Sequence, residues 1–280
     1  MSAERQAAAP PSAEGAPSAP RVSVRVADGV AEVVLARPDK HNALDLEMFR
    51  AIRAAQLEVA ATPGVRAVVL RGAGPSFCSG LDLGAAAAGE LDFAALTGSR
   101  EGPANLAQST SYGWRETPVP VIAAIHGACF GGGLQIALGT DVRIAAPDAR
   151  LSVMEVKLGL VPDMALTAAL PRLVREDVAR ELTYTARIVD GAEAAELGLV
   201  TRVDADPAGA AAALAAEIAA RSPDAVRASK RLLNDAWTAP PEQGLRLETE
   251  LMERLMGTPN QAEAIRAAIA GDAPNFTDPA

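Results

Sequence analysis

The fold is decided by Phe77-Cys78-Ser79-Gly80-Leu81-Asp82-Leu83 and by Gly127-Ala128-Cys129-Phe130-Gly131-Gly132-Gly133-Leu134. The first stretch follows the apolar run 67–70, and the second follows the apolar run 121–125. Each pattern predicts a buried strand that runs into a turn opening a helix. Such a turn leaves backbone N–H groups without an intrahelical partner. Two such donors that converge form an oxyanion hole, so we expect chemistry that passes through an enolate or a tetrahedral oxyanion.

Composition is consistent with a globular protein and argues against some functions. The chain has 280 residues, 49% of them hydrophobic, so it can bury a sizeable core as one large domain or two small ones. Its net charge of −9 argues against a nucleic-acid surface that neutralises phosphates. No stretch approaches the roughly 20 apolar residues of a membrane helix, and we expect no membrane partner.

The N-terminus and the two cysteines indicate the compartment. Residues 1–20 are rich in Ala, Pro, Ser and Glu without the pattern of a signal peptide, so we expect a disordered tail. Cys78 and Cys129 both lie in the glycine turns. The sequence leaves open whether the two form a disulfide. There is no secreted-type disulfide framework, however, and reduced thiols in the cytoplasm are the expected state.

Strands and helices alternate through the first two thirds of the chain. Asp28-Gly29 between two apolar runs predicts a hairpin, and apolar residues at helical spacing predict a helix over 44–59. Residues 84–113 are small and polar, and we expect a mobile segment over a binding site, with short helical pieces. Helical patterns dominate the last third. The chain therefore predicts an α/β core at 21–204 and a helical region at 205–280.

Several catalytic motifs are incomplete. Gly72-Ala73-Gly74 begins a dinucleotide fingerprint, but Phe77 stands where the third glycine belongs. Phe77 also replaces the first glycine of a nucleophile elbow around Ser79. The two histidines are His41 and His126, and His126 is expected to be a packed, hydrogen-bonded residue. No transition-metal spacing is present, so we expect no metal.

Four motifs in order resemble the crotonase superfamily, the enoyl-CoA hydratase/isomerase family. They lie at residues 37–44, 77–83, 126–134 and 141–143. The resemblance runs from about residue 21 to the C-terminus. It implies a spiral of ββα repeats, a helical C-terminal trimerisation region, and acyl-CoA thioester substrates. It also implies a homotrimer or a dimer of trimers, with no cofactor besides the coenzyme A of the substrate.

The resemblance assigns the expected binding residues by position. The oxyanion donors map onto the N–H groups of Leu81 and Gly132. A glycine there lets the thioester oxygen approach the backbone, and a helix N-terminus adds favourable charge. The resemblance implies that coenzyme A is bound along the two loops, largely through backbone groups. The residues implied are Lys40, His41, Ala43, Ser79, Leu81 and Asp82.

The reaction depends on three further positions. Hydratases of the family activate water with two glutamates, and the first position is Gln135 here, which cannot accept a proton from water as a carboxylate does. The second glutamate maps onto Glu155. Asp163 lies where the dienoyl-CoA isomerases of the family carry an aspartate. In an apolar pocket, desolvation and mutual repulsion raise carboxyl pKa values, which suits proton transfer along an acyl chain.

Alternatives stay open from the sequence. Glu155 can be read as a surface ion-pair residue, Asp163 as a helix N-cap after Pro162, and Gln135 as a residue that orients substrate or water or only fills space. The leading hypothesis is an enzyme that shifts a double bond of an enoyl- or dienoyl-CoA. The second is a hydratase that uses Glu155 alone. The third is a non-catalytic relative that binds acyl-CoA or RNA, and the acidic charge weighs against RNA.

Overall fold

A β-hairpin opens the part of the chain described by the computed structural model, which covers residues 20–98 and 100–278. Strands β1 (Val22–Ala27) and β2 (Val30–Leu35) pair antiparallel around the two-residue turn that the sequence predicts. Asp28 and Gly29 both have positive φ, 50° and 77°, as a tight hairpin turn requires. The tail predicted at 1–20 lies outside the described residues, apart from its last residue.

The hairpin leads into a six-stranded sheet in the order β1-β2-β3-β6-β8-β11. All pairs from β2 to β11 are parallel. The central strands are buried, as their continuous apolar runs predict. The strands after the hairpin are β3 (Ala67–Gly72), β6 (Val121–Ile125), β8 (Val142–Ala145) and β11 (Arg202–Val203).

A second, smaller sheet has the order β10-β9-β7. It is formed by β7 (Ala128–Phe130), β9 (Arg150–Ser152) and β10 (Val189–Asp190). The expectation of one strand running directly into a helix is therefore wrong at the second turn, because β7 lies between β6 and the helix α5 (Gly132–Leu138). The chain changes direction at Gly127, where φ is 57° and an added Cβ would collide with the Pro75 carbonyl.

The segment predicted to be mobile at 84–113 divides into two parts. Its first part holds only short elements: α2 (Leu83–Ala87), α3 (Phe93–Gly98), β4 (Arg100–Glu101) and β5 (Ala104–Asn105). The prediction of mobility is wrong for the second part. That part belongs to the regular helix α4 (Leu106–Glu116), which starts with a capping box and is largely buried. Small side chains suggest mobility, but here they let α4 pack closely against α1 (Leu46–Ala61) and α5.

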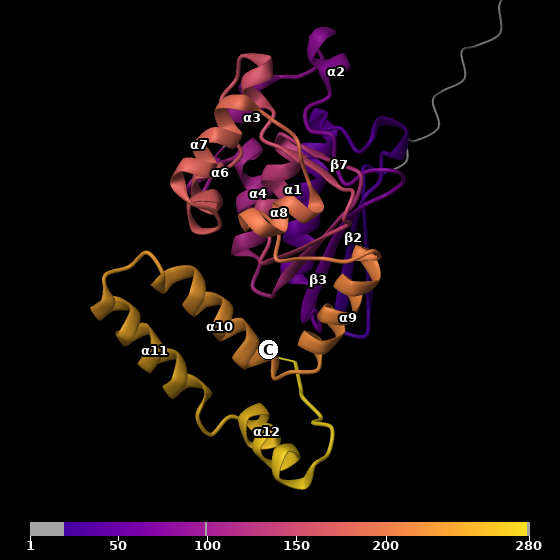
Figure 1. Cartoon of the computed structure of the whole chain (residues 1–280). Helices are drawn as coiled ribbons and strands as arrows, with labels where there is room; N and C mark the ends of the chain where they lie inside the picture. The colour runs from indigo at the N-terminus through magenta and orange to yellow at the C-terminus, as the bar shows by residue number, and fades with distance from the viewer. Residues whose placement is uncertain (1–19, 99, 279–280) are drawn as a thin grey trace, which may run out of the picture.

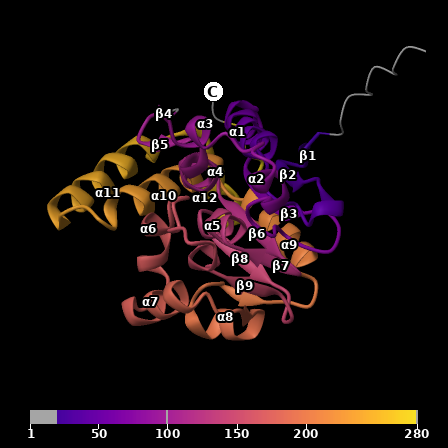
Figure 2. The same ribbon diagram turned by 90° about the horizontal axis from the view of Figure 1, so that it is seen from above.

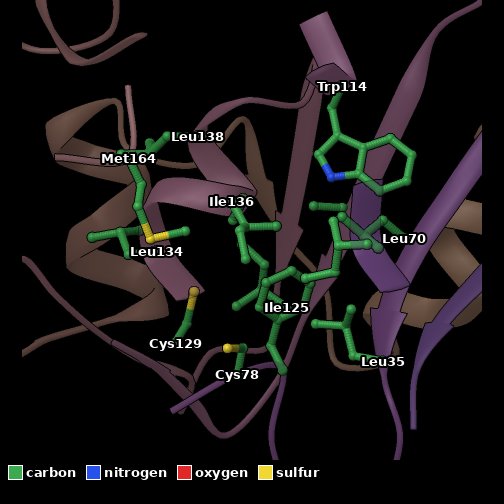
Figure 3. Packing of buried hydrophobic residues seen from close by; sticks show 14 of the residues in the cluster. Leu35, Leu70, Cys78, Trp114, Ile125, Cys129, Leu134, Ile136, Leu138 and Met164 are labelled. Atoms are coloured by element: carbon green, nitrogen blue, oxygen red, sulfur yellow. The ribbon is translucent and has the colours of Figure 1, made fainter. Parts of the chain in front are cut away.

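The main core lies where these helices meet the sheet, and Figure 3 shows part of it. Cys78 and Cys129 are free, fully buried thiols on paired segments of this core. Burial raises the pKa of Cys78 to about 12 and that of Cys129 well above its ordinary value. Both side chains act as small apolar groups, consistent with the expectation of reduced thiols.

The remaining elements form a cap beside the small sheet and a helical arm (Figures 1 and 2). Helix α9 packs on the sheet through Ala211 and Ala215, and the boundary at 204 stays a prediction. Helices α10 to α12 extend away from the core (Figure 1). These elements are η2 (Glu155–Leu158), α6 (Leu166–Ala169), η3 (Leu170–Arg172), α7 (Glu176–Thr185), α8 (Gly191–Leu197), α9 (Pro207–Ala219), α10 (Pro223–Ala236), α11 (Pro241–Leu255) and α12 (Pro259–Ala270).

Within 20–98 and 100–278 no helix has the length and apolar character needed to span a bilayer.

Candidate active site

The loop after β2 is tied to the first glycine stretch by the buried side chain of Asn42. Its amide nitrogen donates hydrogen bonds to the carbonyl oxygens of Ala73, Ser76 and Phe77, at 2.9, 2.8 and 3.1 Å. Asn42 and its neighbour His41 both have positive φ, near 56° and 50°. Asn tolerates this conformation better than most residues, so the sequence itself favours this loop geometry.

The same two segments then run side by side toward the site. The Ser79 N–H donates to the His41 carbonyl at 2.9 Å, and the Leu44 N–H donates to the Gly80 carbonyl at 2.8 Å. The Asp82 N–H donates to the Leu44 carbonyl at 3.0 Å. Leu44 and Leu81 thus form an isolated parallel β-bridge. Its hydrogen bonds use the backbone groups of Gly80 and Asp82, on either side of Leu81.

Two backbone donors face the site without a partner. Among the described residues, no hydrogen bond uses the N–H of Leu81 or of Gly132. Gly132 is the first residue of α5, so its N–H has no intrahelical acceptor. A Cβ built on Gly80 would lie 3.6 Å from the Gly132 nitrogen, which shows how closely the two turns approach. The arrangement has the parts of an oxyanion hole, and the catalytic role of the two donors stays a prediction.

Asp82 is engaged by the protein itself. One carboxylate oxygen accepts from the Ala85 N–H at 3.0 Å and so caps α2, and the other accepts from Arg37 Nη1 at 2.6 Å. The Ala85 N–H and the Arg37 guanidinium lower the pKa of this carboxyl. The Asp82 side chain therefore holds the turn together. Its backbone is engaged as well, since the N–H donates to the Leu44 carbonyl and the carbonyl accepts from the Ala86 N–H.

The other residues expected to contact coenzyme A lie along the same loop. Lys40 is the last residue of the 3₁₀ helix η1 (Pro38–Lys40) and is exposed, as is His41, while Ala43 is buried. His41 Nδ1 lies 2.9 Å from Ser76 Oγ. Of the residues predicted to bind coenzyme A, Ser79 and Leu81 line the cavity described next, and the others are not part of its wall.

An apolar cavity of about 480 Å³ opens beneath the two turns. Side chains such as Phe93 and Val161 line it while remaining 51% and 73% exposed, so its rim presents apolar groups to solvent. Its wall is formed by Leu44, Phe49, Ser79, Gly80, Leu81, Leu83, Phe93, Leu96, Thr97, Ala107, Phe130, Gly131, Gly132, Met154, Glu155, Lys157, Leu158, Leu160, Val161, Asp163 and Met164.

Glu155 is the buried carboxylate of this cavity. It begins η2 and is 8% exposed, so the interpretation as a surface ion-pair residue is wrong. Its Oε1 accepts a hydrogen bond of 2.6 Å from Gln135 Nε2, and its Oε2 is buried with no partner among the described residues. Burial raises the pKa of Glu155, and the charge of Asp163 adds to the rise.

Asp163 lines the same cavity from the loop between η2 and α6. The N-cap interpretation is wrong, because α6 begins at Leu166 and its cap residue is Ala165. The residue is exposed at the rim, yet partial desolvation raises the pKa of its carboxyl. The structure thus brings both predicted carboxylates to one cavity, and their roles in proton transfer stay a prediction.

Gln135 lies behind Glu155 and not on the cavity wall. Its side chain is 1% exposed, and its Oε1 accepts a 2.9 Å hydrogen bond from the Met164 N–H. The contact with Met164 was not anticipated from the sequence. The only feature of the sequence that points to this contact is that Met164 follows Asp163 in the chain.

Sequence reasoning also missed most of the cavity wall. Phe49 and Ala107 reach it from α1 and α4, and Phe93 and Leu96 reach it from α3. Each looks in the sequence like an ordinary apolar residue of a helix face. Lys157 is the one cation among the described wall residues, and it carries no motif.

Comparisons with known proteins agree with this fold and site. The family model for enoyl-CoA hydratase/isomerase matches residues 25–279. The peroxisomal Delta(3,5)-Delta(2,4)-dienoyl-CoA isomerase of Arabidopsis thaliana is 31% identical over 88% of this chain and 92% of its own length. The mitochondrial enzyme of the same name from Rattus norvegicus is 38% identical over 72% of this chain and 64% of its own.

Solved structures give the same result. The enoyl-CoA hydratase of Bacillus anthracis superposes with a TM-score of 0.84 at 30% identity, over 91% of this chain and 98% of that one. The predicted crotonase-like α/β fold is thereby confirmed. The family acts on acyl-CoA thioesters, and its relatives carry the names of hydratases and isomerases. This chain is an enzyme of the enoyl-CoA hydratase/isomerase family.

Proposed function

We propose that this enzyme shifts a carbon–carbon double bond in an enoyl- or dienoyl-CoA. The observation that carries the proposal is the pair of carboxyl groups, Glu155 and Asp163, on the wall of one apolar cavity. The pKa of each is raised by desolvation. The position of the first hydratase glutamate holds the amide of Gln135 instead. The similarity to two dienoyl-CoA isomerases supports the same reaction.

The proposed chemistry is a proton relay. One carboxylate removes a proton from the acyl chain. The electron pair of the broken C–H bond moves toward the thioester, which becomes an enolate with its negative charge on the oxygen. The N–H groups of Leu81 and Gly132 hydrogen-bond that oxygen. A carboxyl group returns a proton at another carbon, so the double bond moves and no atom is gained or lost. A carboxyl pKa closer to neutrality suits both removal and return of the proton.

Turnover of 3-enoyl-CoA and 3,5-dienoyl-CoA tests this proposal. We expect one of them to yield a 2-enoyl- or 2,4-dienoyl-CoA, followed by the change in ultraviolet absorbance. Glu155→Gln and Asp163→Asn should each lower kcat by about 10²–10⁴-fold, the usual contribution of a general acid or base. Binding of both substrates without product from either would reject the isomerase assignment.

A hydratase that uses Glu155 alone is the second candidate, because Glu155 is retained and the Bacillus anthracis neighbour is named as a hydratase. Water addition to crotonyl-CoA, in the wild type and in Gln135→Glu, separates the two reactions. A large gain of hydration in the variant favours a site built for water and lacking one carboxylate. If Glu155→Ala retains all turnover, Glu155 has no catalytic role.

We propose that the coenzyme A moiety lies along the loop at Lys40, His41, Ala43, Ser79, Leu81 and Asp82. Lys40 is exposed there and can meet a phosphate, while the backbone of the loop offers polar groups to the adenine end. No cofactor is invoked beyond the coenzyme A of the substrate. A cytoplasmic location and an assembly of one or two trimers complete the proposal.

A further inference from the structure

The side chain of Gln135 connects three segments of the site. It projects from α5, accepts a hydrogen bond from the Met164 N–H at 2.9 Å, and donates one to Glu155 Oε1 at 2.6 Å. Asp163 shares the peptide bond of that Met164 N–H. One amide group therefore contacts the buried carboxylate and the backbone that carries the second carboxylate.

The Met164 N–H determines which way this amide is turned. A backbone N–H can only donate, so the carbonyl oxygen of Gln135 must face it. The NH₂ group of Gln135 is then left facing Glu155. A hydrogen bond donated by a neutral amide favours the ionised form of the carboxylate that accepts it. Because Oε1 is occupied in this way, Oε2 is the oxygen of Glu155 left to receive a proton.

We propose that Gln135 is a positioning residue, which favours the base form of Glu155, leaves its Oε2 free and fixes the Asp163–Met164 peptide. The catalytic meaning of this role rests on the proposed isomerisation, but the contact between the amide and the carboxylate does not. Gln135 is 1% exposed and absent from the cavity wall, so direct contact with substrate or water is not its role.

Few other charges act on Glu155 from the cavity. Asp163, from the loop before α6, and Lys157, from η2, are the other titratable groups on the described part of the cavity wall. Burial and the Asp163 charge raise the pKa of Glu155, while the backbone of Glu155, the Gln135 hydrogen bond and the backbone of Met154 lower it. Removing the hydrogen bond from Gln135 is therefore expected to raise the pKa of Glu155 further.

The first test is Gln135→Met, which keeps a similar volume and removes both hydrogen bonds. The ionisation of Glu155 is followed by infrared absorption of ¹³C-glutamate-labelled protein, as the difference from the same protein with Glu155→Gln. We expect the pKa of Glu155 to rise by about one to two pH units, the usual strength of a hydrogen bond to a charged group. An unchanged titration overturns the proposal.

Gln135→Glu is the second variant and guards against misfolding of the first. Its carboxyl can still accept from the Met164 N–H, but it has lost the amide donor and brings a second acid group against Glu155. We expect the two carboxyls to share one proton at neutral pH, which appears as an additional protonated carboxyl in the infrared spectrum. Two ionised carboxylates at pH 7 overturn the proposal.

Gln56→Met is the matched control. Gln56 is also a buried glutamine, 2% exposed, whose amide donates to the Thr110 carbonyl at 3.1 Å, and it is not on the cavity wall. We expect this variant to lose stability while the Glu155 titration stays as in the wild type. A titration moved equally by both substitutions shows a general structural effect and overturns a specific role for Gln135.

Kinetics separate this inference from the proposed function. With an active isomerase, Gln135→Met should move the acid limb of kcat/KM upward by the same one to two pH units while KM changes little. Failure of the wild type to turn over any enoyl-CoA rejects the proposed function, and the infrared titration still decides the role of Gln135. Turnover that depends on Glu155 but has an unmoved acid limb in Gln135→Met rejects the inference alone.

Discussion

Desolvation acts on Glu155 and Asp163 in the same direction, because each carboxyl lies at the wall of an apolar cavity. An ionised group in such surroundings loses hydration that the unfolded chain would restore. The site therefore keeps its acid–base groups at a cost to stability. A loss of stability of this kind is common at active sites, where function and stability compete.

Glu155→Gln should show this cost. The raised pKa means that the folded protein holds the Glu155 proton more tightly than the unfolded chain, so its free energy of unfolding falls as pH rises through that pKa. We expect Glu155→Gln to be more stable than the wild type at pH 8, with the difference vanishing below about pH 4, the ordinary glutamate range. Urea unfolding across this pH range measures it. Glu58→Gln, at an exposed position on α1, is the control, and an equal gain there would contradict the explanation.

Gly80→Ala should damage the site through the backbone. Gly80 has φ of 86°, and an added Cβ would lie 2.7 Å from the Phe130 carbonyl oxygen, close to the proposed oxyanion donors. We expect a loss of about 1–3 kcal/mol of stability and a fall in kcat of at least about tenfold. Gly89→Ala is the matched control, because Gly89 also has positive φ, 71°, but no atom lies within 4 Å of its added Cβ. Equal effects of both changes would rule out crowding as the cause.

At the scale of elements, one buried lysine attaches the helical arm to the core. Lys230 of α10 is 6% exposed and donates to the carbonyls of Trp114 and Val119 at 3.0 and 2.9 Å. It also donates to Asp141 Oδ2 at 2.7 Å, and Asp141 accepts from the Val121 N–H at the start of β6. Helix α10 is thereby held against α4 and the sheet.

Lys230→Met should loosen this attachment. The change leaves two carbonyl groups and the partly exposed Asp141 carboxylate without their donor, and each buried acceptor left unpaired costs about 1–3 kcal/mol. We expect a loss of this size in equilibrium urea unfolding. Arg231→Met, at the next position of α10 where the side chain is 47% exposed, should cost less than about 1 kcal/mol. Similar losses in both variants would show that Lys230 is not the attachment.

At the scale of the whole molecule, the arm formed by α10–α12 leaves large apolar side chains exposed. Trp237, Met252 and Ile269 are 70%, 59% and 84% exposed. Helices that extend from a domain with such a surface are suited to packing against other copies of the chain. This is the observation in the structure that supports the proposed trimer.

Met252→Asp should therefore weaken assembly. We expect light scattering of the wild type to give three or six times the chain mass of 28.7 kDa, and the variant to shift toward one chain at micromolar concentration. Glu253→Gln, an exposed polar change beside it, should leave the mass unaltered. A wild type that is monomeric at every concentration would contradict the oligomer proposal.

Local patterns were sufficient to predict the hairpin, the buried strands and the two glycine turns. Each depends on neighbours in sequence: Asp28-Gly29 prefers positive φ, and the apolar runs can only be buried. The extra strand β7 and the buried helix α4 were missed, because each is stabilised by segments far away in the chain. Small residues do not reveal from sequence alone whether they pack or move.

The sequence by itself determined the family, the two turns and the identities of Gln135, Glu155 and Asp163. Only the tertiary structure decided what these three residues do to one another. It places both carboxyls on one cavity, buries Glu155, and turns the Gln135 amide by means of the Met164 N–H. The physical reason is that a pKa and an amide orientation depend on desolvation and on hydrogen bonds between distant segments, which a linear pattern does not contain.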